Sequence, residues 1–286
     1  LELRSRASPI LQELSGFYRL PGIPGDRQRL ILRGQVTAEE PDAYDAVIGE
    51  LGVRVEADLS SAVTAGIGPT LRLGKVKQNL DTTETVLLGL PGGITFDRRN
   101  DRLDATRGFL LQWNQAPYIG LDRDRLNLWK MDLQLSGYKP LAEGDTWVLA
   151  GRVMTGILVG EAFESVPADL RFYAGGGGSV RGYKYQTAGP LGRDEDPLGG
   201  RSLLETSVEL RRRLTEKIGL VTFVDSGTVF RQGWPDFSEP LRVGAGLGIR
   251  YATPIGALRV DVATPINRRE GVDPAVQVYF GFGQAF

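Results

Sequence analysis

The most regular feature of the chain is an alternation of apolar and polar residues with a period of two. In Leu241–Tyr251, "LRVGAGLGIRY", one set of alternate positions is apolar and the other holds glycine or arginine. The same alternation recurs in "LLETSVELR", "GALRVDVATP", "WKMDLQL" and "AVQVYFGFGQAF". A period of two is typical of β-strands whose two faces meet different surroundings. The pattern therefore predicts an all-β protein.

About 14 segments carry this pattern. They lie near residues 1–8, 13–20, 26–37, 43–57, 60–76, 81–97, 104–115, 123–138, 145–160, 200–213, 217–230, 240–252, 256–265 and 275–286. No segment shows a sustained helical stripe of apolar residues, so we expect little helix. The longest connection without strand patterning runs from Gly160 to Gly200, and connections of that length are usually functional or disordered.

The two faces of the predicted strands indicate a membrane barrel. About 14 long strands would close into a cylinder too wide for side chains to fill. Charged residues and glycines would suit a wet lumen, and the apolar faces would then meet lipid. We therefore predict one domain over residues 1–286, a transmembrane antiparallel up-and-down β-barrel with a long loop at 161–199 inserted in its lumen. A soluble barrel or sandwich is the alternative.

Composition narrows the possible functions. The net charge of −1 gives no reason to expect a nucleic-acid partner. The absence of Cys and His removes disulfides, metal sites built on those ligands, and Ser-His-Asp triads. No other catalytic constellation is evident, so we expect neither an enzyme nor a cofactor. The chain begins at Leu1 without Met or a signal peptide, and we interpret it as a fragment or mature segment.

The glycine-rich stretch "FYAGGGGSVRGYKY", Phe172–Tyr185, allows more than one interpretation. "GGGGS" alone could be an engineered linker, but composition does not change across it. A phosphate-binding loop is not supported, because the glycines are not followed by Gly-Lys-Ser/Thr and no βαβ pattern surrounds them. We therefore interpret the glycines as a flexible approach to the residues that follow.

Several blocks in order resemble one family. "VPADLRFYAGGGGSVRGYKY" is similar to the sixth-loop motif of the bacterial surface antigen family, the outer-membrane assembly and translocation barrels that include BamA, TamA and two-partner-secretion transporters. "GITFDRRNDRLDATRG", "LVTFVDSGTVF" and "LRVGAGLGIRYATPIGALRVDVATPI" are similar to its other strand motifs. The resemblance implies 16 strands with this loop after the eleventh. We therefore expect that the first two strands, and the POTRA repeats before them, are missing from this chain.

The resemblance also implies a charge clamp. It assigns the loop motif to Val180, Arg181, Gly182 and Tyr183, and it assigns Glu209 and Asp225 as the acids that hold Arg181. Phe223 falls in the associated strand motif. An arginine withdrawn from bulk water needs such carboxylate partners. The alternative is that both acids are solvated charges on the lumen wall.

The last strand is the second candidate site. A final Phe286 after alternating aromatics resembles the C-terminal signal of outer-membrane barrels, and in the family the first and last strands form a lateral seam. The seam and signal residues implied are Val276, Val278, Phe280, Gly281, Phe282, Gly283 and Phe286. Glycine weakens strand pairing. The alternatives are an ordinary hydrophobic edge strand, and glycines that only make space for neighbouring aromatics.

These resemblances imply a protein insertase or translocase in the bacterial outer membrane. The loop lead-in and "RGYKY" resemble TamA most, which implies autotransporter and other unfolded β-barrel clients, outer-membrane lipids, and an inner-membrane-anchored TamB-type partner. The alternatives are a BamA-like assembly factor and a two-partner-secretion transporter. A passive porin-like channel is an alternative of another class. An outer-membrane hydrolase finds no support, because no suitable carboxylate or Ser-Lys site is evident.

Overall fold

The computed structural model describes residues 1–122, 125–192, 194–254 and 256–286, and they form an all-β fold. Its strands are β1 (Glu2–Ser8), β2 (Leu11–Pro21), β3 (Gln28–Glu39), β4 (Asp45–Asp58), β5 (Val63–Ile67), β6 (Thr70–Gln78), β7 (Asp81–Gly89), β8 (Gly92–Asp97), β9 (Gly108–Gly120), β10 (Asn127–Pro140), β11 (Trp147–Val159), β12 (Ser202–Arg213), β13 (Ile218–Phe230), β14 (Arg242–Thr253), β15 (Gly256–Pro265) and β16 (Gln277–Phe282).

Helix is confined to three short 3₁₀ turns within the described residues. They are η1 (Glu143–Asp145), η2 (Phe163–Ser165) and η3 (Ala168–Leu170). None of the helices found there is long and apolar enough to cross a membrane. The low helix content agrees with the lack of any helical stripe in the sequence.

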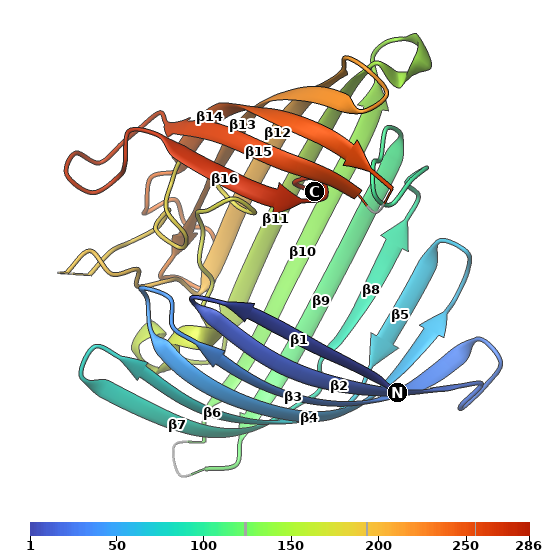
Figure 1. The fold of residues 1–286 in the computed structure, drawn as a ribbon. Coiled ribbons are helices and arrows are strands. Elements are labelled where there is room, and N and C mark those ends of the chain that lie inside the picture. The colour runs from blue at the N-terminus through green and yellow to red at the C-terminus, as the bar shows by residue number, and fades with distance from the viewer. Residues whose placement is uncertain (123–124, 193, 255) are drawn as a thin grey trace. The chain divides into compact units, whose positions relative to one another are not determined.

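The sixteen strands found in the described residues form fourteen rows, because two rows each contain two strands. Figure 1 labels these strands. Strand β4 pairs with both β5 and β6, which are one long strand interrupted at Gly68 and Pro69. The segments β7 and β8 are interrupted in the same way at Leu90 and Pro91. Proline has no N–H to donate to a sheet and is therefore found at such breaks. The fourteen rows match the segments predicted from alternation.

The chain divides into two compact units that share strands. Unit 1 comprises Leu1–Phe96, Gln112–Asp132 and Ile157–Arg171, and unit 2 comprises Asp97–Leu111, Leu133–Gly156 and Phe172–Phe286. Antiparallel hairpins build unit 1 from β1 to β4 and unit 2 from β12 to β16. Strands β9, β10 and β11 contribute residues to both units.

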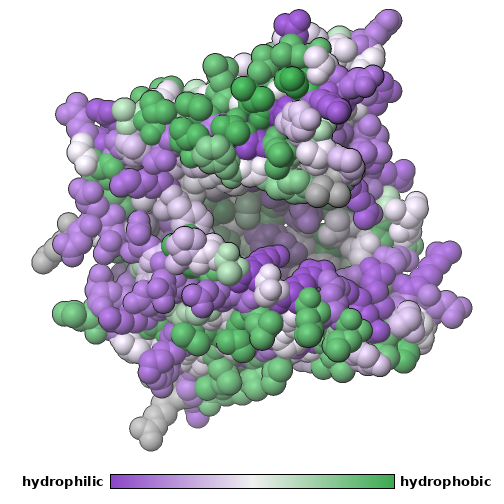
Figure 2. Space-filling model, viewed as in Figure 1, coloured by the Kyte–Doolittle hydropathy of each residue, from purple (hydrophilic) through white to green (hydrophobic). Residues whose placement is uncertain are grey.

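The faces of the strands are arranged as the alternation predicts, with polar residues buried and apolar residues exposed. On β14, Leu247 is 65% exposed, whereas Arg250 is 4% exposed. On β12, Val208 is 54% exposed and Glu209 is fully buried. The exposed apolar side chains form green clusters on the surface in Figure 2. This is the reverse of a soluble β protein and is the arrangement expected of strands that face lipid.

A long loop covers residues 160–201 between β11 and β12. Its first part, with η2 and η3, belongs to unit 1, and its second part, from Phe172, belongs to unit 2. Each part contacts strands of its own unit, and the second part contains the residues singled out in the sequence.

Candidate functional site

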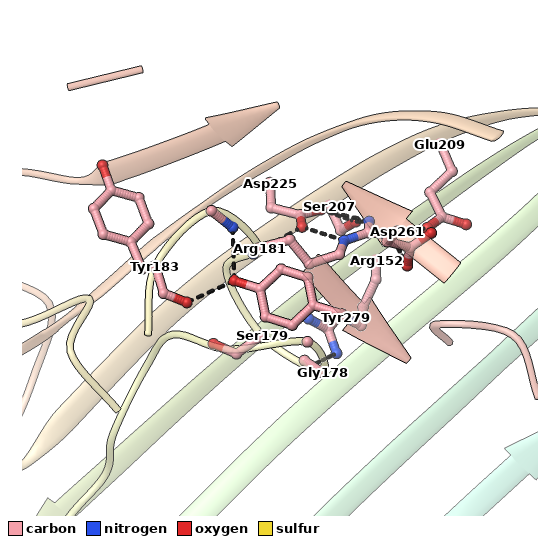
Figure 3. A network of polar contacts seen from close by, with 12 residues as sticks. Arg152, Gly178, Ser179, Arg181, Tyr183, Ser207, Glu209, Asp225, Asp261 and Tyr279 are labelled. Atoms are coloured by element: carbon pink, nitrogen blue, oxygen red, sulfur yellow. Dashed lines mark hydrogen bonds and ion pairs between the residues drawn. The ribbon is translucent and has the colours of Figure 1, made fainter. Parts of the chain in front are cut away.

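The motif "VRGY" is buried against the polar face of unit 2. Val180 and Tyr183 are fully buried and Arg181 is 1% exposed. The surrounding side chains come from β12, β13, β15 and β16 (Figure 3). These three loop residues are therefore as fully buried as residues of a protein core.

The guanidinium of Arg181 is held by three carboxylates. Its Nε and Nη2 donate hydrogen bonds to Asp225 at 2.6 and 2.9 Å. Its Nη1 forms ion pairs with Glu209 at 2.8 Å and with Asp261 at 3.3 Å. The two-pronged contact uses the planar fork that only arginine offers. The structure thus brings together both acids that the resemblance assigned and adds a third.

Two further side chains shape this pocket. The guanidinium carbon of Arg181 lies 3.4 Å from the centroid of the Phe223 ring, a cation–π contact. The Ser207 hydroxyl donates to Asp225 at 2.5 Å, so the carboxylate that binds Arg181 is itself fixed. The sequence resemblance had assigned Phe223 to a strand motif, whereas nothing in the sequence pointed to Ser207.

Further ion pairs surround the Arg181 clamp. Arg211 pairs with Glu209 at 2.8 Å, and Arg250 pairs with Asp261 at 2.5 Å. Four buried arginines accompany four buried acids on this face, namely Arg152, Arg181, Arg211 and Arg250 with Glu205, Glu209, Asp225 and Asp261. Burial alone would lower the pKa of Arg181, but the hydrogen bond to Asp225 and the charges of Glu209 and Asp261 outweigh it and raise the pKa.

The residues after Arg181 are fixed by a chain of hydrogen bonds. The N–H of Gly182 donates to the Tyr279 hydroxyl at 2.9 Å, and that hydroxyl donates to the Tyr183 carbonyl at 2.7 Å. The Tyr183 hydroxyl donates to Asn267 Oδ1 at 2.7 Å. Gly182 has a φ of +103°, and a Cβ there would lie 2.9 Å from the Thr264 carbonyl carbon. Glycine is required at this position on both counts.

The glycines of β14 make room for the loop. A Cβ on Gly244 would lie 1.7 Å from the Arg181 carbonyl oxygen, and one on Gly248 would lie 1.9 Å from Asp261 Oδ1. Both distances are far below van der Waals contact. The glycines that alternate along β14 in the sequence therefore form the surface on which Arg181 and its acids lie.

The glycine run before the motif is anchored, which corrects its interpretation as a flexible approach. Gly177 and Gly178 accept hydrogen bonds at their carbonyls from Arg259 at 3.0 Å and from Arg152 at 2.9 Å. The N–H of Gly175 donates to the Ser179 hydroxyl at 2.8 Å, and that hydroxyl donates to Glu205. Side chains of the neighbouring strands therefore hold this segment by hydrogen bonds. The sequence alone could not predict these contacts, because the strand residues lie far from the loop in sequence.

The first part of the loop has a separate anchor in unit 1. Asp169 of η3 forms an ion pair with Arg72 of β6, and their side chains are 1% and 5% exposed. Arg72 also lies 3.6 Å from Glu50. Arg171 donates to the Gln78 side chain at 3.2 Å. Sequence reasoning missed this anchor and also Asp261, although Asp261 occupied a polar-face position in the alternation.

The C-terminal residues follow the prediction only as far as Phe282. Phe280 and Phe282 are exposed on β16, and Val278 shares their face. The prediction that the strand runs from 275 to 286 is wrong: Val276 precedes β16, and Phe286 lies beyond its end and packs beside the buried Tyr138. Gly283, with a φ of +85°, turns the chain out of the strand direction.

The two glycines of this segment have different roles. A Cβ on Gly281 would lie 2.5 Å from Arg259 Nε, so this glycine makes space for an arginine rather than for an aromatic. A Cβ on Gly283 would meet nothing within 4 Å, so its role is conformational.

Comparison with known proteins identifies the family. The model described as "Omp85 superfamily domain" matches residues 21–286. The outer membrane protein assembly factor BamA of Nitratidesulfovibrio vulgaris is 29% identical over 173 residues, which cover 59% of this chain and 21% of that protein. BamA of Neisseria meningitidis serogroup B is 26% identical over 224 residues, covering 66% of this chain and 28% of that protein. The matched segments thus span only 21% and 28% of these relatives.

Solved structures show the same fold. BamA from Haemophilus ducreyi lacking POTRA domains 1–3 superposes with a TM-score of 0.81 at 18% identity, covering 96% of this chain and 63% of that one. CdiB from Acinetobacter baumannii gives a TM-score of 0.61 at 17% identity, covering 94% of this chain and 50% of that one. The chain therefore has the fold of the BamA barrel.

Proposed function

We propose, from the premise that this chain belongs to the Omp85 superfamily, that it is the membrane domain of a protein that inserts or translocates other proteins at the bacterial outer membrane. The outer membrane is its location. The observation that carries the proposal is the buried Arg181 clamp, which fixes the loop against the strands of unit 2. We propose that the domain acts by guiding protein chains and performs no catalytic step.

The experiment uses the full-length protein in a Gram-negative strain depleted of its native copy. Folding of reporter β-barrels is measured by their heat-modifiable migration in gels. We expect wild-type protein to restore folding and Arg181→Ala to fail. Arg268→Ala, at an exposed loop arginine, is the matched control and should restore folding. Failure of the wild-type protein to restore folding of any reporter would contradict the proposal.

A passive porin-like channel makes the opposite prediction. A porin would conduct ions steadily in a planar bilayer without any client, and removing it would not impair the folding of other barrels. Steady conductance together with normal reporter folding after depletion would favour the porin and reject the insertase.

Strand β16 supports a lateral seam as the route for clients. It has only six residues. All six pair with β15, from Gln277 opposite Ala263 to Phe282 opposite Leu258. A disulfide between Val260→Cys and Phe280→Cys, which face each other in the register, holds β16 on β15. If clients enter by displacing β16 at the seam, this disulfide should stop insertion until reductant is added. The matched control joins Val224→Cys and Ala245→Cys on β13 and β14. Equal insertion by both oxidised proteins would contradict the seam.

The finer assignment is a TamA-like role with autotransporter clients and a TamB-type inner-membrane partner. It rests on the likeness of "VPADLRFYAGG" and "RGYKY" to TamA. The BamA relatives and the CdiB neighbours support the alternatives, a BamA-like assembly factor or a two-partner-secretion transporter. Co-purification of the full-length protein with a TamB-type inner-membrane protein would support the TamA-like role, and its absence would favour the alternatives.

A further inference from the structure

The apolar faces of the strands from β9 to β16 carry only two charged residues. Alternate positions on these faces are apolar or uncharged polar residues. The exceptions are Lys139 on β10 and Arg212 on β12, and both are exposed. No acidic side chain lies on these faces in strands β9 to β16 as the structure describes them. The charge on this surface is therefore positive and confined to one place.

Lys139 and Arg212 lie at the same end of their strands, on either side of Trp147. Each is the second-last residue of its strand, and Trp147 is the first residue of β11, which lies between β10 and β12. On one side, the N–H of Leu141 donates to the Trp147 carbonyl at 2.8 Å. On the other side, the guanidinium carbon of Arg212 lies 5.0 Å from the centroid of the Trp147 ring. We call Lys139, Trp147 and Arg212 the interfacial site.

The two cations of the interfacial site have no carboxylate partner. Arg213, the next residue of β12, points to the polar face and pairs with Asp104 at 3.1 Å. Arg212 instead makes a cation–π contact with Trp147, and neither Arg212 nor Lys139 forms an ion pair with any residue that the structure describes. A cation–π contact uses no N–H donor, so the guanidinium keeps its planar fork of donors for an anion.

The interfacial site lies where the apolar faces end. Along β10 the exposed Leu135 comes before Lys139, and along β12 the exposed Val208 comes before Arg212. Cations and aromatic rings at the edge of an apolar band lie at the depth of the lipid headgroups. The long loop leaves from the opposite ends of β11 and β12, so the site belongs to the leaflet on the side of the short turns.

We propose that the interfacial site binds the phosphate of an anionic glycerophospholipid whose headgroup contains no cation of its own. Arg212 donates N–H groups to the phosphate oxygens, and Lys139 adds a second positive charge on the other side of Trp147. A choline headgroup would bring a positive charge against these two cations, so the net charge of the lipid decides binding. The site is separate from the loop clamp and from β16.

The test measures quenching of tryptophan fluorescence by brominated lipids in the full-length protein, reconstituted in nanodiscs of phosphatidylcholine. A minor share of the lipid is dibrominated phosphatidylglycerol in one arm and dibrominated phosphatidylcholine in the other. The signal of Trp147 is obtained by comparing each protein with the same protein carrying Trp147→Phe. We expect phosphatidylglycerol to be enriched ~5-fold over phosphatidylcholine beside Trp147, the attraction that one cation exerts at an anionic surface.

Arg212→Gln should remove most of this enrichment. Arg212→Lys should keep part of it, because an ammonium retains the charge but not the fork of donors. Arg213→Gln changes the adjacent arginine on the opposite face of β12, so it is the matched control and should leave the enrichment unchanged. Lys139→Gln removes the other cation and serves as a second variant if Arg212→Gln does not fold.

Equal enrichment of the two lipids beside Trp147 in the wild type would overturn the proposal. An enrichment that persists in both Arg212→Gln and Lys139→Gln would overturn it as well. A loss in Arg213→Gln as large as that in Arg212→Gln would assign the preference to the general charge of this end of the domain and reject the site. No client protein is present in these measurements, so each of these results leaves the proposed function to its own test.

Discussion

Arg181 and Asp225 are joined by three hydrogen bonds, two from the guanidinium and one from the backbone N–H of Arg181 at 3.1 Å. The carboxylate therefore fixes both the side chain and the main chain of the loop at one point. This single pairing, 44 residues apart in sequence, determines where the loop crosses the polar face of unit 2.

Removal of the Arg181 guanidinium should destabilise the folded domain. Arg181→Ala leaves the buried carboxylates of Glu209, Asp225 and Asp261 without their shared cation, at a cost of about 3 kcal/mol or more. Arg181→Lys should restore only part of this, because a single ammonium cannot reproduce the fork. Urea unfolding in lipid vesicles measures the free energy of unfolding, with Arg268→Ala as the exposed control. An unchanged free energy and wild-type resistance of the loop to protease in Arg181→Ala would contradict the clamp.

A methyl group on Gly244 should expel the loop without removing any charge. The added Cβ would overlap the Arg181 carbonyl oxygen, which it would approach to 1.7 Å. Lys184 is already exposed, so we expect Gly244→Ala to speed trypsin cleavage after Lys184 by releasing the backbone of the loop. Gly137→Ala is the control, because a Cβ there would meet nothing within 4 Å. Equal cleavage rates in these two variants would mean that the loop does not depend on this close approach.

The ion pair between Asp169 and Arg72 should stabilise unit 1 by a direct contact of its own. Asp169→Asn leaves the buried Arg72 with the more distant Glu50, 3.6 Å away, as its remaining carboxylate, which should destabilise unit 1 by about 3 kcal/mol or less. Replacement of both residues together should destabilise less than the sum of the single changes, because they are in contact. Glu164→Gln, at an exposed residue of η2, is the control. Strict additivity of the two single changes would contradict a direct pairing.

A third contact of the loop should weaken in acid. Arg269 donates to the carbonyls of Thr187 and Gly189 at 2.6 and 3.1 Å and is itself held by Asp273. Burial would raise the pKa of Asp273, but the hydrogen bond from Arg269 outweighs this and lowers the pKa below its ordinary value. A lowered carboxyl pKa stabilises the folded state above the unfolded value of about 4, and this stabilisation is lost as pH falls through the folded pKa.

Hydrogen exchange at residues 187–189 tests this directly. After correction for intrinsic rates, protection in the wild type should fall as the pH is lowered from about 6 to 3. Asp273→Asn should show low protection at every pH, with no further loss in acid. A wild-type profile that is flat over this range would show that Asp273 does not hold Arg269.

Sequence alternation determined the strands and their two faces, because the direction of a strand side chain depends only on its position along the chain. The fourteen rows and the buried polar face could therefore be predicted. The pairing of Arg181 with Glu209 and Asp225 was indicated by family resemblance, since no local rule relates residues so distant in sequence.

Only the tertiary structure decided which polar residues meet. Asp261, 80 residues from Arg181, joins the clamp through the pairing of β14 with β15, and Asp169 reaches Arg72 because η3 lies on β6. The turn at Gly283 redirected Phe286 from the predicted lipid face to the polar face. A prediction from alternation treats the strand as continuous. The alternation of side chains does not show where a residue with a positive φ will end the strand.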